Sequence, residues 1–264
     1  MKRFSDKTHK QLSGEGVTPY QLRQEFNEEL ELTLELLHAQ GLILVERDGR
    51  YRYETTGIDW KEAVFCIVDI ETNGSKPEKH QIIEIGAVKV QNFTIIDRFE
   101  SLVECRDISP HITEITGISV DDTEHAPPMR EVLHAFRLFL GTSVFVAHDV
   151  KFDYSFISAM CERVGLPPLM NRRLCTIDLS ERTISSYRYG LKYLNEQLDL
   201  YEGATHHRAL SDAITTAKLF KRILLHIPEP IKSAEELIQF SKEAKRLKRP
   251  KFDPRLAEEP QSDA

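Results

Sequence analysis

The sequence predicts an α/β protein in which a mixed sheet carries helices on its faces and a small helix-and-hairpin module comes first. Three observations support this fold class. Apolar segments of strand type follow one another over residues 63–102, and strand-like and helical segments then alternate to about residue 226. Before them, helical segments precede a tight turn at Asp48–Gly49. At 264 residues, the chain has room for one domain of about 150 to 200 residues and a smaller unit.

Composition describes an ordinary globular protein, with 41% hydrophobic and 29% charged residues. The net charge of −7 lacks the basic balance typical of nucleic-acid-binding proteins. No apolar run approaches the roughly 18 residues of a membrane span, and the first residues lack the apolar core of a secretory signal. We therefore expect a cytoplasmic protein without a membrane partner. Four widely spaced cysteines favour buried thiols over a disulfide frame or a zinc site: Cys66, Cys105, Cys161 and Cys175.

Residues 1–60 are expected to form a winged-helix-like module. Thr18-Pro19 is a typical helix start, Asn27 is a possible cap for a second helix, and Asp48–Gly49 predicts a hairpin turn. The second helix carries glutamates and no lysine or arginine, unlike a helix that enters the major groove. A packing or protein-docking role is therefore favoured. The alternative, a DNA-reading wing, would use the arginines of the hairpin: Arg47, Arg50 and Arg52.

Residues 61–226 are expected to form the α/β domain. Apolar segments predict strands at 63–70, 81–90, 94–102 and 143–147, with a shorter one near 174–177. Helical spacing of apolar residues predicts helices at 129–140, 152–164, 191–197 and 209–225. The second and third strands would form a hairpin that turns near residues 91–93. A meander followed by strand–helix alternation favours a mixed sheet covered by helices.

Residues 227–264 are expected to form a helical and then flexible C-terminal tail. Ser233 and Glu236 form a capping box that opens a helix over residues 234–248. Residues 242–255 contain seven basic and two acidic side chains. This basic run could contact a phosphate backbone or an acidic partner, and a solvated helix face is the alternative.

The segment FCIVDIETNG, residues 65–74, ends an apolar strand in two acids, Asp69 and Glu71. Side chains two residues apart in a strand point to the same face, so these carboxylates would lie side by side and repel each other. Acids at strand ends are common, and the pair alone is weak evidence of a site. Evidence of a functional site therefore has to come from residues elsewhere in the chain.

Two further acids stand at the beginnings of predicted helices. Asp153 follows the strand of residues 143–147, in a first turn where the helix dipole favours a negative charge. Asp212 borders an apolar helical stripe, just after His206 and His207. An acid at the edge of a core-facing surface costs free energy unless it is paired or bound to a metal.

Four such acids suit hard divalent cations, because Mg²⁺ and Mn²⁺ prefer carboxylate oxygens. Two of these ions, roughly 4 Å apart, can hold the attacking and leaving oxygens of a phosphoryl transfer. They would also cancel the repulsion between Asp69 and Glu71. A neutral histidine beside them can accept the proton of the attacking water. Zinc is disfavoured, because the cluster offers no thiolate.

The segments DIETNG, HDVKFD and HHRALSDA, in this order, resemble the three motifs of the DEDDh family of 3′-5′ exonucleases. The resemblance covers about residues 61–226 and is nearest to the epsilon-type proofreading subunits of bacterial DNA polymerase III. It implies a ribonuclease-H-like fold with a mixed five-stranded sheet. Two features depart from the pattern: Asp149 stands where asparagine is common, and the module of residues 1–60 is an addition.

The resemblance also implies residue roles. Asp69 would bridge two Mg²⁺ or Mn²⁺ ions, Glu71 and Asp212 would complete the ion on the nucleophile side, and Asp153 would hold the second ion. His207 would be the general base. Only the position of the histidine within the third family motif separates His207 from the competing candidate, His206. The residues implied in substrate binding are Thr72, Asn73, His148 and Phe152.

The leading hypothesis is a metal-dependent 3′-5′ exonuclease that removes 5′-nucleoside monophosphates from a single-stranded or frayed DNA 3′ end. It would act as a proofreading subunit, and a polymerase subunit would bind its C-terminal tail. A free-standing DNA-repair or RNA-trimming exonuclease and a non-catalytic binding module are the alternatives. QLDLY, residues 197–201, resembles the peptide that docks on sliding clamps. Leu198 and Leu200 are expected in the core, so clamp binding is the less favoured interpretation of it.

Overall fold

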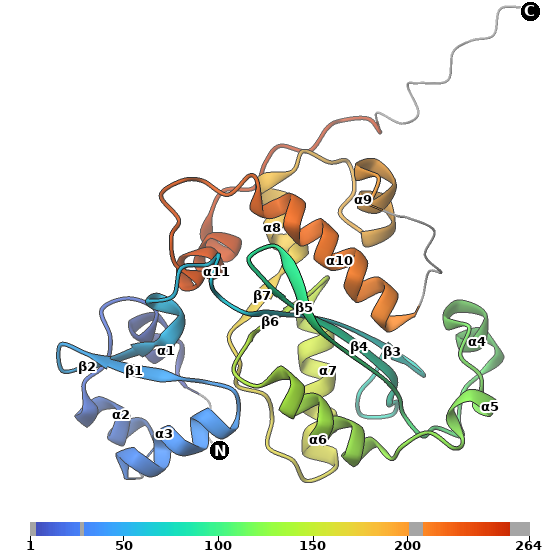
Figure 1. Cartoon of the computed structure of the whole chain (residues 1–264), viewed down its shortest axis with the longest axis horizontal. Helices are drawn as coiled ribbons and strands as arrows, with labels where there is room; N and C mark the ends of the chain where they lie inside the picture. The colour runs from blue at the N-terminus through green and yellow to red at the C-terminus, as the bar shows by residue number, and fades with distance from the viewer. Residues whose placement is uncertain (1–3, 27–28, 201–207, 254–264) are drawn as a thin grey trace, which may run out of the picture.

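The computed structural model describes residues 4–26, 29–200 and 208–253 (Figure 1). Its centre is a mixed five-stranded sheet with the strand order β5-β4-β3-β6-β7. The strands are β3 (Phe65–Thr72), β4 (Ile82–Gln91), β5 (Thr94–Leu102), β6 (Val144–Ala147) and β7 (Arg173–Cys175). β3, β4 and β5 form an antiparallel meander, while β6 runs parallel to both β3 and β7. The predicted mixed sheet with flanking helices is confirmed.

Helices cover both faces of the sheet (Figure 1). Phe65 and Ile67 of β3 belong to one hydrophobic core, and Cys66 and Val68 belong to another, because successive residues of a strand point to opposite faces. The first core is closed by α8 (Thr176–Thr183), α9 (Leu191–Leu198), α10 (Ala209–Leu224) and α11 (Ala234–Glu243). The second is closed by α6 (Met129–Leu140) and α7 (Val150–Arg163). Burial on both sides explains the nearly continuous apolar runs of β3 and β4.

Several boundaries differ from the prediction. The strand expected near residues 174–177 ends at Cys175, and Thr176 begins α8, a helix that the sequence analysis did not predict. The helix expected over residues 234–248 ends at Glu243. Arg182 donates hydrogen bonds to the carbonyls of Lys242 and Ala244, which satisfies acceptors left open where the helix stops. Three further short helices were also not predicted: α1 (Asp6–Leu12), α4 (Pro110–Thr116) and α5 (Val120–Thr123).

The N-terminal module consists of three helices followed by a hairpin. Its elements are α1 (Asp6–Leu12), α2 (Pro19–Phe26), α3 (Leu30–Ala39), β1 (Leu44–Arg47), β2 (Arg50–Tyr53) and the 3-10 turn η1 (Glu54–Thr56). Asp48 and Gly49 form the predicted turn, with φ of 54° and 70°. Asn27, the expected cap of the second helix, lies outside the described residues. The winged-helix class of the module stays a prediction.

Two of the three hairpin arginines, Arg50 and Arg52, are engaged within the module. Arg50 donates to the carbonyl oxygen of Gly16 at 3.1 Å, and Arg52 donates to those of Gly14 and Glu15, both at 3.0 Å. These guanidinium groups hold the hairpin against the chain between α1 and α2. The contacts favour a packing role over a DNA-reading wing.

The module is attached to the sheet domain by buried polar contacts. The guanidinium group of Arg172 lies 4.1 Å from the ring centre of Tyr53 and forms an ion pair with Glu235 of α11. The Thr55 hydroxyl donates to the same carboxylate at 2.7 Å. In the other direction, the amide of Met170 donates to the carbonyl of Gln40 at 2.9 Å. These contacts join segments that are far apart in the chain.

The basic segment that follows α11 lies against α8. Arg246 and Arg249 both form ion pairs with the carboxylate of Glu181, and the amide of Leu247 donates to the Glu181 carbonyl at 2.7 Å. Among the helices of the described residues, none is long and apolar enough to cross a bilayer.

Candidate active site

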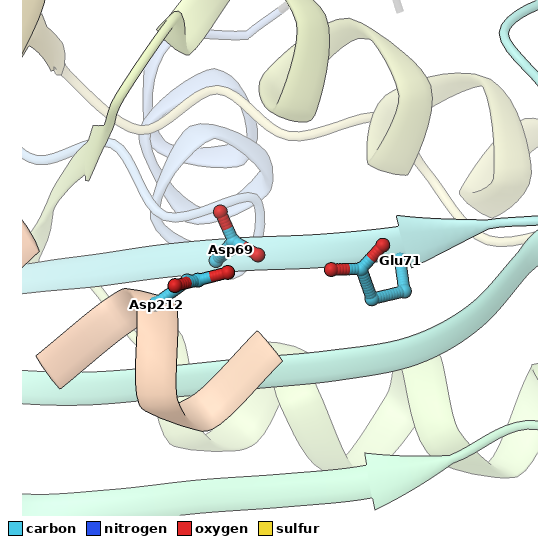
Figure 2. Close-up of side chains that lie close together, drawn as sticks. All are labelled: Asp69, Glu71 and Asp212. Carbon is cyan, nitrogen blue, oxygen red and sulfur yellow. The ribbon is translucent and has the colours of Figure 1, made fainter. Parts of the chain in front are cut away.

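Three of the predicted acids meet at the end of the central strand (Figure 2). Asp69 and Glu71 lie on the β3 face that α10 covers, and Asp212 lies in the first turn of α10. Figure 2 shows the three carboxylates gathered between the strand and the helix. One oxygen from each carboxylate lies within 4.8 Å of those of the other two. Such an all-oxygen group fits a hard divalent cation.

Gly86 of β4 allows α10 to approach the sheet this closely. Gly86 pairs with Asp69 across the β3–β4 ladder. A Cβ atom at this position would lie 2.1 Å from the backbone of Ala209 and Leu210, which is well inside van der Waals contact. The lack of a side chain therefore lets the helix backbone rest on the strand, and Asp212 is carried to the acids of β3.

Glu84 is a polar residue of the site that the sequence analysis missed. It is fully buried in β4 and pairs with Glu71 across the ladder. Its carboxylate accepts hydrogen bonds from the Arg208 guanidinium, at 2.6 and 3.0 Å, and from the Ala209 amide, at 2.8 Å. The signal in the sequence is one acid inside the apolar run IIEIGAV, residues 82–88.

Asp153 reaches the strand from the opposite side of the sheet. It lies in the first turn of α7 and is only 5% exposed. Burial raises the pKa of this carboxyl, and the backbone of Ile70, the residue between Asp69 and Glu71, is close enough to act against that shift. Asp153 is outside the group of three carboxylates that meet within 4.8 Å.

The pKa values of these acids are raised by burial and by mutual repulsion. Burial raises the pKa of Asp69 well above its ordinary value, and Asp153, Glu71 and Asp212 raise it further. Burial raises the pKa of Glu71 to about 7, Asp212 and Glu84 add to the shift, and Arg208 opposes it. Burial also raises the pKa of Asp153. Without a cation these acids compete for protons, so their charge suits a bound divalent metal.

The structure places three of the predicted substrate-binding residues as follows. Thr72 is half-buried at the end of β3. The Asn73 side chain donates to the Asp107 carbonyl and accepts from the Gln81 amide, both at 2.7 Å. Phe152 is 37% exposed on the first turn of α7, with its ring centre 5.5 Å from that of Phe156. Phe152 therefore offers an accessible aromatic surface, while Asn73 fixes the loop that follows the strand.

His148 has internal partners at both ring nitrogens. Nδ1 is 2.9 Å from the Thr176 hydroxyl, and Nε2 is 2.8 Å from the Tyr189 carbonyl oxygen. Burial lowers the pKa of His148 to about 4, so the ring is neutral at physiological pH. These contacts hold the loop before α7. A direct substrate contact by His148 stays a prediction. The candidate bases, His206 and His207, lie outside the described residues.

A family model described as an exonuclease, RNase_T, matches residues 66–220. Among curated proteins, the chain is similar to the PolC-type DNA polymerase III of Staphylococcus haemolyticus, with 34% identity over 198 residues. The PolC-type enzyme of Staphylococcus aureus (strain bovine RF122) is 32% identical over the same length. Both matches cover 74% of this chain and 14% of the relative, so the chain spans only a small part of the length of these proteins.

Solved structures show the same architecture. Exonuclease X in complex with 5′ overhanging duplex DNA is 27% identical, has a TM-score of 0.54, and matches over 67% of this chain and 99% of its own. Escherichia coli exonuclease I in complex with a dT13 oligonucleotide is 15% identical and has a TM-score of 0.56, over 62% of this chain and 42% of its own. The expected ribonuclease-H-like exonuclease fold is confirmed.

Proposed function

This chain belongs to the exonuclease family RNase_T, and we propose that it is a 3′-5′ exonuclease that removes 5′-nucleoside monophosphates from DNA ends with two bound Mg²⁺ or Mn²⁺ ions. The observation that carries the proposal is the convergence of Asp69, Glu71 and Asp212 within 4.8 Å, with Asp153 close enough to Asp69 to raise its pKa. Oxygen-only ligands in a buried acidic group favour these ions over softer metals.

In the proposed reaction, Asp69, Glu71 and Asp212 would hold one ion, and Asp153 would hold the other together with Asp69. Bound divalent cations neutralise the acids and stabilise the charge that develops on the scissile phosphate. The exposed ring of Phe152 stacks on a base near the 3′ end, and the base–aromatic contact is sequence-tolerant. Thr72 and Asn73 line the strand end where that nucleotide lies.

The proton of the attacking water is assigned to an imidazole nitrogen of His207. In the sequence, this histidine directly precedes Arg208, which begins the described segment that leads into α10. A neutral imidazole is a suitable acceptor near physiological pH. Asp149, one residue after His148, adds a negative charge beside the site and disfavours close approach of an unscreened phosphate there.

We assign the activity to DNA and to proofreading, as for an epsilon-type subunit of DNA polymerase III. The PolC-type polymerases among the relatives and the DNA-bound exonuclease X support this choice. The polymerase partner would bind the tail of residues 227–264, and the enzyme would act in the cytoplasm. Leu200 is only 5% exposed and Leu198 packs on the same core, so a sliding clamp is not the favoured occupant of the QLDLY segment.

A free-standing exonuclease is the second candidate function. Its support is the match to exonuclease X, which covers 67% of this chain and 99% of that chain. The matched part of this protein therefore corresponds to nearly the whole of that exonuclease chain, without a polymerase region. Copurification with a polymerase subunit favours the proofreading role, and a monodisperse active protein without one favours the second candidate.

The test is a time course with Mg²⁺ on two 5′-labelled primer–templates, one matched and one mismatched at the 3′ end, beside an RNA strand of equal length. We expect a ladder that shortens from the 3′ end, faster on the mismatch. Asp69→Ala should abolish it, while Asp97→Ala, which removes an exposed acid of the same sheet, should not. A wild-type protein inactive with both Mg²⁺ and Mn²⁺ would overturn the proposal, and a preference for RNA would move the function to RNA trimming.

A further inference from the structure

We propose that Glu84 is a positioning residue for the carboxylate cluster: it fixes the start of α10 on the sheet, so that Asp212 meets Asp69 and Glu71. This inference rests on the proposed exonuclease function for its consequence in catalysis. Glu84 acts on the cluster through its hydrogen bonds with Arg208 and Ala209.

A buried carboxylate in the middle of an apolar strand requires compensation. Glu84 is fully buried, between Ile83 and Ile85, which are also fully buried. Removing an ionised carboxylate from water costs several kcal/mol unless an opposite charge and hydrogen bonds replace the solvent. Both kinds of partner are present, and both come from α10: the guanidinium group of Arg208 and the amide of Ala209.

The amide contact completes an unfinished helix end. The first amides of a helix have no partner inside the helix, and they usually receive a side-chain cap from the residue that begins it. Arg208 occupies that position in α10 and makes no side-chain cap. Glu84 supplies the acceptor from the sheet instead, 2.8 Å from the Ala209 amide, and places a negative charge at the positive end of the helix dipole.

One helical turn connects Arg208, which Glu84 binds, to Asp212. The amide of Asp212 donates to the carbonyl of Arg208 at 3.0 Å. On the sheet side, Glu84 is the ladder partner of Glu71. One carboxylate therefore connects the strand pair that carries two of the acids to the helix that carries the third. This connection holds three repelling carboxylates close together before a cation is bound.

The test compares Glu84→Gln and Glu84→Ala with wild type in two measurements: Mn²⁺ binding by titration calorimetry, and steady-state hydrolysis as a function of Mg²⁺ concentration. Residues that orient metal ligands typically contribute about 10- to 100-fold in metal affinity or activity. We expect Glu84→Ala to weaken Mn²⁺ binding and to raise the Mg²⁺ concentration for half-maximal rate by about tenfold or more. Glu84→Gln keeps the side-chain volume and an acceptor for Ala209 but loses the charge, so a smaller shift in the same direction is expected.

Glu100→Gln is the matched control. Glu100 lies on the neighbouring strand β5, 3.9 Å from the same Arg208 nitrogen that Glu84 binds, and it is exposed at the surface. Its loss should change the Mn²⁺ affinity and the Mg²⁺ midpoint by less than about twofold.

The outcomes separate the two proposals. Folded Glu84 variants with an unchanged Mn²⁺ affinity and Mg²⁺ midpoint would overturn the positioning role, even if the fraction of active protein fell. If the Glu84 variants bind Mn²⁺ more weakly but the wild-type protein does not cleave DNA, the positioning role is supported and the proposed function is overturned. Weakened binding together with a raised Mg²⁺ midpoint in an active enzyme supports both.

Discussion

At the scale of single residues, the acids of the site oppose the stability of the metal-free fold. Burial raises the pKa of Asp69 well above its ordinary value, and four neighbouring carboxylates raise it further. A group that resists ionisation in the fold, but ionises freely in the unfolded chain, favours unfolding at neutral pH. The site is therefore held together by the surrounding structure, at a cost that a bound cation offsets.

Asp69→Asn should make the metal-free protein more stable while abolishing hydrolysis. The amide keeps the size of the side chain and removes one of the repelling charges, so we expect a gain of about 1–2 kcal/mol in the free energy of unfolding. Urea denaturation in the presence of a chelator measures the stability, and the shortening of the 5′-labelled primer measures the activity. Asp97→Asn, at an exposed position of β5, should change neither. A less stable Asp69→Asn protein would contradict this account of the cluster.

The raised pKa of Glu71 predicts how the stability of the metal-free protein changes with pH. Burial raises its pKa from 4.5 to about 7. Because the fold binds this proton more tightly than the unfolded chain, the metal-free protein should lose stability as the pH rises from 4.5 through 7, by roughly 3 kcal/mol for this group. Denaturation midpoints at about pH 5.5 and about pH 8, compared with those of Glu71→Gln, isolate its share. Equal pH slopes for the two proteins would rule out the raised pKa.

His207 is the proposed general base. His207→Ala should reduce the rate of hydrolysis by about 10²–10⁴-fold with little effect on the fold, because only proton transfer is lost. His206→Ala is the matched control one residue away. If the His206 variant is the damaged one, the base has to be reassigned to that position. The pH–rate profile distinguishes the two further, since loss of the base removes its acidic limb.

At the scale of elements, the site depends on the close contact between α10 and β4. Gly86→Ala places a methyl group where a Cβ would lie 2.1 Å from the Ala209 backbone, so the helix has to move. A displacement on the order of 1 Å can reduce catalysis by about 10²-fold. We expect a loss of that order, measured as kcat. Gly14→Ala is the control, because a Cβ there meets only the Lys10 carbonyl oxygen at 3.7 Å. Normal kcat in Gly86→Ala would show that the contact is not required.

The long elements could be predicted from the sequence and the short ones could not. The strands around Asp69 and the helix that carries Asp212 were placed within two residues of their observed bounds. The missed helices, α1, α4, α5 and α8, contain between four and eight residues. Helices this short offer one or two periodic positions and are held by tertiary contacts, so periodicity does not reveal them.

At the scale of the whole molecule, the buried ion pair between Arg172 and Glu235 of α11 lies against the N-terminal module. The side chain of Glu235 is 2% exposed and that of Arg172 is 14% exposed. Burial alone would raise the pKa of Glu235, but the charge and hydrogen bonds of Arg172 outweigh burial and lower it. The same guanidinium group packs on the Tyr53 ring of the module. The pair therefore links the module, the chain before β7 and α11.

Arg172→Ala should destabilise the protein by about 3–5 kcal/mol, because it leaves the Glu235 carboxylate buried without a partner. The double variant Arg172→Met with Glu235→Leu should recover much of that loss. Chemical denaturation of the full chain measures both. Arg106→Ala is the control, since its pair with Glu104 is largely exposed and contributes under about 1 kcal/mol. A loss of similar size in the control and in Arg172→Ala would contradict the special role of the buried pair.

The sequence by itself determined the order of the long strands and helices, the shared face of Asp69 and Glu71, and the helix starts that carry Asp153 and Asp212. These features follow from local periodicity, which fixes the face of each side chain. Tertiary packing alone showed that Glu84 binds residues 124 and 125 positions away and that Gly86 lies beneath α10. It also showed that Arg50 and Arg52 of the hairpin bond to their own module. Such pairings depend on how distant segments pack, and no local pattern specifies the partner of a buried charge.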